Sequence, residues 1–209
     1  MKALFAFLAV LGWLLAADSA QATHFLLIDG SRVYNVAVAA GQPNTFCTSG
    51  DHRGDAGRVL DVLNEQDGWR VLPYSVVNEP DCTLADIEVR YANLGDTWWV
   101  ARVYIQGLEP IDINGTRYWS QERFIVEINA DRYWPLTEWS KKLVVNHEWG
   151  HVVGVLADHP TEAYGCERLL MNYCWLVNVP QAAELQVVQE HYQALSTSLP
   201  QPTMLPLIL

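Results

Sequence analysis

Apolar and polar positions predict β-strands through most of the first two thirds of the chain. Apolar runs that alternate or are rich in β-branched and aromatic residues are typical of strands. Such runs cover residues 33–39, 69–77, 85–91, 98–105 and 123–130. Two shorter strands, residues 111–113 and 116–118, flank Asn114-Gly115, a pair that favours a two-residue hairpin turn. Residues 44–57 are rich in Gly, Asp, Ser and Thr, and we expect a loop there.

Three segments have the apolar spacing of helices. Residues 58–66 carry valines and leucines at helical intervals, and Thr137 can cap a helix over residues 138–154. Pro180 can open a last helix, whose apolar positions recur on one face. Strands interleaved with helices, without an evident linker, predict a single α/β (α+β) domain with a mixed sheet and a C-terminal helix.

The N-terminus has the layout of a secretory signal peptide. A short basic start, an apolar run over residues 3–17 and Ala20-Gln21-Ala22 predict cleavage after residue 22. The run is shorter than the roughly 20 residues that a membrane-spanning helix needs. We therefore expect a secreted protein whose mature domain is residues 23–209, without stable membrane insertion.

If the protein is exported, its four cysteines meet an oxidising compartment, so we expect two disulfides. Three pairings are possible, and closure of a short loop favours Cys166–Cys174, which leaves Cys47–Cys82. No pair has the Cys-x2-Cys spacing of a zinc site.

The net charge argues against nucleic acid as a partner. The chain has 13 basic and 24 acidic side chains, a formal net charge of -11, so it repels phosphate backbones and we expect no nucleic-acid binding. We expect a monomer acting on a protein or peptide. Whether Ca²⁺ binds is left open, since no acidic loop has ligand spacing.

The segment His147-Glu148-Trp149-Gly150-His151 carries the candidate chemistry. On a helix, positions i and i+4 share a face, so His147 and His151 can hold one metal ion while Glu148 reaches a water beside it. Gly154 follows three residues later, where a positive φ could stop the helix and turn the chain back towards the metal.

With the Leu170-Met171-Asn172-Tyr173 segment, this motif resembles that of the metzincin zinc metallopeptidases. Their His-Glu-x-x-His-x-x-Gly-x-x-His/Asp motif precedes a Met-containing turn beneath the metal. An Asp-His pair and a Cys shortly before Leu-Met look most like the small secreted snapalysin type, whereas the Met-x-Tyr spacing is similar to astacins and serralysins. The resemblance implies that Met171 packs beneath the ligands and that Tyr173 helps to hold the oxyanion.

For the third ligand the sequence offers Asp158, which we favour, with His159 as the alternative. The family position three residues after Gly154 is Ala157, so the loop carries at least one extra residue. Asp158 is the ligand if the Asp-His pair aligns with snapalysin, and His159 is the ligand if the loop bulges further. A distant carboxylate, Glu162 or Glu167, is a weaker third choice, because such ligands come from a separate helix.

The resemblance implies a secreted zinc endopeptidase with one catalytic Zn²⁺, in which Glu148 is the general base for a zinc-bound water. Two alternatives stay open: a non-catalytic secreted binding domain that has lost the metal, and a zinc hydrolase acting on cell-wall peptide. Cys47 could also block the zinc in a latent form, if it is not in a disulfide. Trp98-Trp99, Trp119, Trp134 and Trp139 could line a cleft for bulky side chains, although burial is the default for tryptophan.

Overall fold

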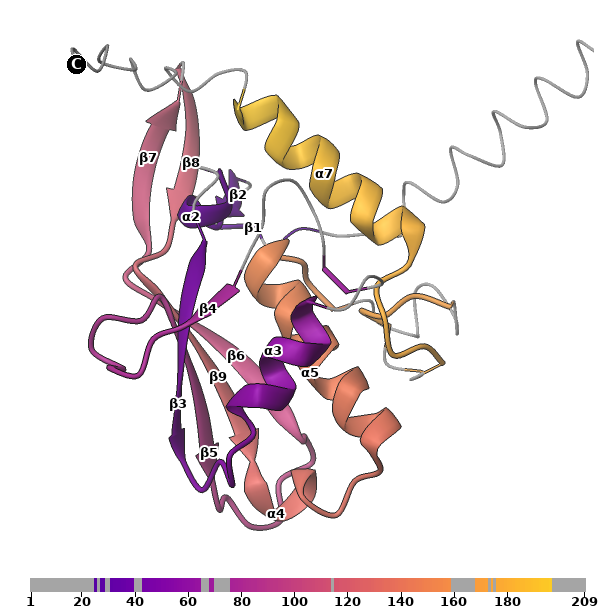
Figure 1. The fold of residues 1–209 in the computed structure, drawn as a ribbon. Coiled ribbons are helices and arrows are strands. Elements are labelled where there is room, and N and C mark those ends of the chain that lie inside the picture. Colours follow the sequence, from indigo (N-terminus) through magenta and orange to yellow (C-terminus); the bar gives the residue numbers. More distant parts are fainter. Residues whose placement is uncertain are drawn as a thin grey trace, which may run out of the picture.

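The computed structural model describes residues 25, 27–28, 31–39, 43–64, 68–69, 76–113, 115–158, 168–172, 174 and 176–196. These residues form a mixed α/β fold of two sheets and several helices (Figure 1). The predicted α+β class is therefore confirmed.

A five-stranded sheet forms the centre of the fold. Its strands, in spatial order, are β4 (Val76–Asn78), β3 (Asn44–Gly50), β5 (Ile87–Ala92), β9 (Arg123–Asn129) and β6 (Ala101–Gln106). The first four run parallel, and β6 pairs antiparallel with β9 at one edge. This antiparallel edge strand is the one that borders the candidate site.

A second, four-stranded sheet contains the predicted hairpin. Its order is β1 (Leu27–Ile28), β2 (Ser31–Tyr34), β8 (Thr116–Ser120) and β7 (Glu109–Ile113). β7 and β8 pair antiparallel with Ile113 opposite Thr116. Gly115 has φ +78°, a left-handed conformation that glycine adopts without a steric cost, so the hairpin turn is confirmed.

Helices α3 (Ala56–Asn64) and α5 (Glu138–Val153) cover one face of the five-stranded sheet (Figure 1). The short helices α2 (Val36–Ala39) and α4 (Ala130–Tyr133) follow β2 and β9, and α7 (Ala182–Ser196) lies near the end of α5. Inward-facing side chains of the sheet and the two helices form one apolar core, which includes Phe46, Val59, Ile87, Val89, Phe124, Val126, Val144 and Trp149. Burial of this core is the main favourable contribution to folding.

Most predicted strands and helices are present, with shifted ends. One exception is the run 33–39, which divides into the end of β2 and helix α2. Of the run 69–77, Val76 and Val77 belong to β4, and residues 70–75 lie outside the described part of the chain. Apolar periodicity alone does not separate a short strand from one turn of helix, since both bury small β-branched residues.

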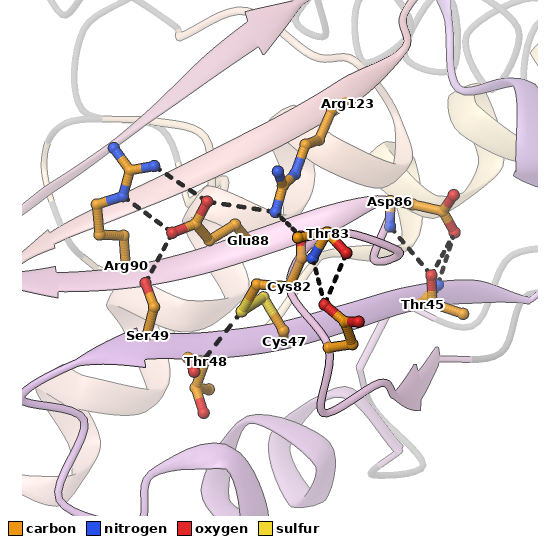
Figure 2. A network of polar contacts seen from close by, with 11 residues as sticks. Thr45, Cys47, Thr48, Ser49, Cys82, Thr83, Asp86, Glu88, Arg90 and Arg123 are labelled. Carbon is orange, nitrogen blue, oxygen red and sulfur yellow. Dashed lines mark hydrogen bonds and ion pairs between the residues drawn. A yellow bond between two sulfur atoms is a disulfide. The ribbon is translucent and has the colours of Figure 1, made fainter.

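The prediction of a loop over residues 44–57 was wrong for its first half, which is the central strand β3. The small polar residues that suggested a loop are bonded across the sheet (Figure 2). Thr45 donates from its backbone N–H and its hydroxyl to Asp86, at 2.8 and 2.9 Å, and Ser49 donates to Glu88 at 2.7 Å. A polar residue is buried without a large cost when it is hydrogen-bonded, so composition misrepresented this segment.

The predicted Cys47–Cys82 disulfide is present and joins β3 to the segment before β5 (Figure 2). Cys47 is fully buried in this bond, so the alternative in which its thiolate blocks a metal is wrong. The predicted partner of Cys174, Cys166, lies outside the described residues, and that pairing stays a prediction.

Helix α5 begins as predicted, because the Thr137 hydroxyl accepts the N–H of Ser140. It ends at Gly154, as predicted, but without the positive φ that was expected there. Gly154 keeps helical angles, with φ −92° and ψ −12°, and the next residue, Val155, has the positive φ of 46°. Gly154 is required for a different reason: a Cβ there would lie 2.8 Å from side-chain carbons of both Leu156 and Val188, so glycine lets α7 approach α5.

None of the helices in the described part of the chain has both the length and the hydrophobicity that a bilayer crossing requires.

Candidate metal centre

Two histidines on one face of α5 form the base of the site. His147 and His151 are one helical turn apart, and their ring centroids are 5.1 Å from each other. Both side chains are half-buried at the wall of a cleft. The predicted juxtaposition of these two rings is thus present on α5.

Backbone carbonyls fix the orientation of both rings. The Nδ1 atom of His147 lies 3.0 Å from the carbonyl oxygen of Leu170, and that of His151 lies 2.7 Å from the carbonyl oxygen of Leu156. A carbonyl only accepts, so each Nδ1 carries the hydrogen and donates it. When a ring is neutral, it therefore presents the lone pair of Nε2 to the cleft, the arrangement typical of metal-bound histidines.

Asp158 brings a third donor atom to the same point. Its Oδ1 lies 3.0 Å from Nε2 of His147 and 3.3 Å from Nε2 of His151. The turn that directs it here contains Val155, whose left-handed conformation is costly for a β-branched residue. Strained backbone of this kind is common at functional sites.

The structure does not describe four of the predicted site residues. The alternative third ligands His159, Glu162 and Glu167 and the proposed oxyanion partner Tyr173 lie outside the described residues. Their roles stay predictions. Among the described residues, one group of His, Cys, Asp and Glu side chains could hold a metal ion, and it consists of His147, His151 and Asp158.

The donor set fits a metal ion. The three donor atoms lie within 4.8 Å of one another, and two imidazole lone pairs and a carboxylate oxygen facing one point require positive charge between them. In the metal-free protein a proton supplies it: burial by itself lowers the pKa of His147, but the hydrogen bond to Asp158 and the charge of Glu148 raise it to about 9. The same two histidines lower the pKa of Asp158 against the effect of its burial.

Glu148 lies next to this cluster in an environment that favours proton transfer. Its side chain is 6% exposed, and Oε2 has no hydrogen-bond partner among the described residues. Burial raises the pKa of its carboxyl above the ordinary value. A buried carboxylate with an unpaired oxygen and a raised pKa is suited to act as a base.

Met171 lies beneath the two histidines and is fully buried. A Cβ built on Gly150, which lies between the histidines in sequence, would be 2.3 Å from the Met171 sulfur and 2.9 Å from the Trp69 ring. The glycine therefore lets the thioether touch the backbone of α5. That Met171 packs beneath metal ligands, as the sequence resemblance implies, stays a prediction.

The donor atoms face a cleft of about 640 Å³ between α5 and the edge strand β6. Half-buried side chains of β6, namely Ala101, Val103 and Ile105, form the wall opposite the histidines. Trp98 and Trp99 extend this wall, and Trp98 is 85% exposed. Trp98 and Trp99 thus line a cleft, whereas Trp119, Trp134 and Trp139, which were expected there as well, are not among its lining residues.

The sequence did not identify the groups that orient the histidines. They are backbone carbonyls, which every residue carries, so no side-chain pattern marks Leu156 or Leu170. Glu184, whose carboxylate bonds the backbone of the Met171 turn, was also missed, because one glutamate on an amphipathic helix resembles any solvated residue.

No protein-family model matches the chain, and no curated protein sequence is significantly similar to it.

We predict that Gly150→Ala lowers the free energy of unfolding by about 1–3 kcal/mol, the usual cost of an overpacked core. The added methyl group would overlap the Met171 sulfur and the Trp69 ring. The control is Gly57→Ala in α3, where a Cβ meets nothing within 4 Å and the free energy should rise by about 0.4–1 kcal/mol. Urea unfolding measures both, and equal effects of the two substitutions would contradict the contact.

We predict that metal affinity increases with pH up to about 9, the pKa of His147. Below that value the metal must displace the His147 proton, so the apparent association constant should rise about tenfold per pH unit. Protonated His147 also stabilises the metal-free protein. This contribution to the free energy of unfolding is complete below the ordinary histidine pKa and is lost as the pH rises through about 9. Calorimetry in buffers of different ionisation enthalpy counts the released protons. Affinity independent of pH between 7 and 9 would refute the prediction.

Proposed function

We propose that the protein is a secreted zinc-dependent endopeptidase of metzincin type. The observation that carries the proposal is the convergence of His147, His151 and Asp158 on one point beside Glu148, with both Nδ1 atoms bonded to carbonyls. Two nitrogens and one oxygen are a ligand set that leaves zinc one open position, as catalytic rather than structural sites do. A bound zinc ion would polarise the scissile carbonyl and make an attacking water more acidic.

The residues of the chain have separate roles in this proposal. His147, His151 and Asp158 hold the ion, and the carbonyls of Leu170 and Leu156 keep the two rings in the correct tautomer. Glu148 takes the proton of the attacking water on its unpaired Oε2 and then donates it to the leaving amine. Its burial favours this, because the raised pKa makes the carboxylate a stronger base.

The edge strand supports a polypeptide as the substrate. β6 pairs only with β9 among the described strands, so its outer side offers N–H and C=O groups at the cleft. An extended peptide can add to such an edge as a further strand. The scissile bond would then lie between the backbone of β6 and the side chains of α5.

Metal content tests the ligand set. We expect about one zinc per chain in the oxidised wild-type protein. Asp158→Ala should bind zinc much more weakly, because it removes a ligand. The fall in affinity should exceed the roughly 10–100-fold that is typical of outer-shell substitutions. His159→Ala should retain the zinc. The reverse result would make His159 the third ligand. No zinc in the wild type, after exposure to the metal, would refute the site and favour the non-catalytic binding domain.

Peptidase activity tests the role of Glu148. We expect Glu148→Gln to keep its zinc and to lower kcat/KM on an unfolded protein such as casein by about 10²–10⁴-fold, the usual contribution of a general base. The matched control is Glu109→Gln, the same chemical change at an exposed position of β7, which should cleave at the wild-type rate. Normal turnover by the Glu148 variant would exclude it as the base.

A further inference from the structure

One buried carboxylate has no role in the proposed mechanism. Glu184, in the first turn of α7, is fully buried. Its Oε2 accepts the backbone N–H groups of Leu170 at 3.1 Å and Gln181 at 2.8 Å, and its Oε1 accepts that of Met171 at 3.0 Å. A buried carboxylate requires such partners, and hydrogen bonds to an ionised acceptor are among the strongest in proteins.

Two of these three donors belong to the turn beneath the histidines. Leu170 and Met171 are in neither a helix nor a strand, so no regular ladder fixes their N–H groups. Glu184 bonds both N–H groups from the first turn of α7, 13 and 14 residues further along the chain. Its side chain therefore joins the turn to α7.

The contact continues from the turn to a candidate ligand. Leu170 donates its N–H to Glu184 and accepts the Nδ1 hydrogen of His147 on its carbonyl at 3.0 Å. Met171 donates its N–H to Glu184, and its side chain touches the backbone of α5 at Gly150. Glu184 is thus connected to the histidine face of α5 by two short routes.

We propose that Glu184 is a positioning residue of the metal centre, which holds the Leu170 carbonyl in place and through it the tautomer and direction of His147. The inference rests on the proposed zinc function only in its last step. The route from Glu184 to His147 is a property of the protein without metal, so it can be tested separately.

The test uses Glu184→Gln in the full chain. The amide keeps the shape of the side chain, but its nitrogen cannot accept, so at least one of the three N–H bonds is lost. Glu190→Gln is the matched control, because Glu190 is an exposed residue of the same helix whose carboxylate accepts only from the Gln186 side chain among its described contacts.

Two measurements follow for each variant. In the metal-free protein, nuclear magnetic resonance records the amide exchange of Leu170 and Met171 and the Nδ1 proton signal of His147. Zinc affinity is then measured by competition with a chelator, and Co²⁺ replaces zinc as a spectroscopic probe of ligand geometry. We expect Glu184→Gln to speed exchange at the two amides, lose the His147 signal, alter the Co²⁺ spectrum and bind zinc about 10–100-fold more weakly. Glu190→Gln should match the wild type.

The remaining outcomes each decide for or against the positioning role. Faster amide exchange with an unchanged His147 signal and unchanged zinc affinity would mean that Glu184 only stabilises the turn. If the wild type itself binds no zinc, the proposed function fails, and the His147 signal alone decides: its persistence in Glu184→Gln overturns the positioning role, and its loss supports it. If the Gln variant does not fold, Glu184→Asp, which keeps the charge but withdraws the oxygens, is judged by the same signals.

Discussion

The structure depends on the need to satisfy the polar groups of a buried helix. Helix α5 lies against the sheet on one side and near α7 at its end, yet it carries Asn146, Glu148 and two histidines. A polar group removed from water without a partner costs several kcal/mol on most scales. The segments around α5 supply those partners: the carbonyl of Asn178 accepts from Asn146, and Asn35 donates to the carbonyl of Val152. Two oxygens of the helix are exceptions: Oδ1 of Asn146 and Oε2 of Glu148 are buried without a hydrogen-bond partner among the described residues.

The sequence predicted those parts of the fold that follow from apolar spacing and turn chemistry. The hairpin at Asn114-Gly115 and the start of α5 at Thr137 were correct because each depends on a local interaction. Strand β3 was not predicted, since its threonine and serine residues find their partners on β5 or just before it, some 40 residues away. The positive φ expected at Gly154 was also wrong. Glycine is needed there because a Cβ would overlap Val188, and that contact comes from another helix, α7.

The candidate site divides in the same way. The spacing of His147 and His151 was predictable, since a helical turn determines it. The turn that brings Asp158 beside the two histidines was not predictable, because Val155 adopts a conformation that is rare for a β-branched residue. The carbonyls that orient the rings were also beyond the sequence, since their positions depend on how the turns at residues 154–156 and 169–171 fold.

The three donor atoms come from residues 147–158, a short and nearly continuous stretch. Closing so small a loop costs little entropy, so these residues can meet around an ion before the sheet has formed. An ion that also binds the unfolded chain stabilises the native state by less than its native affinity suggests. What the folded protein adds is the surroundings of these donor atoms, namely the fixed ring tautomers and the cleft. If an ion binds here, its capture would be a local event, whereas its reactivity would depend on the whole fold.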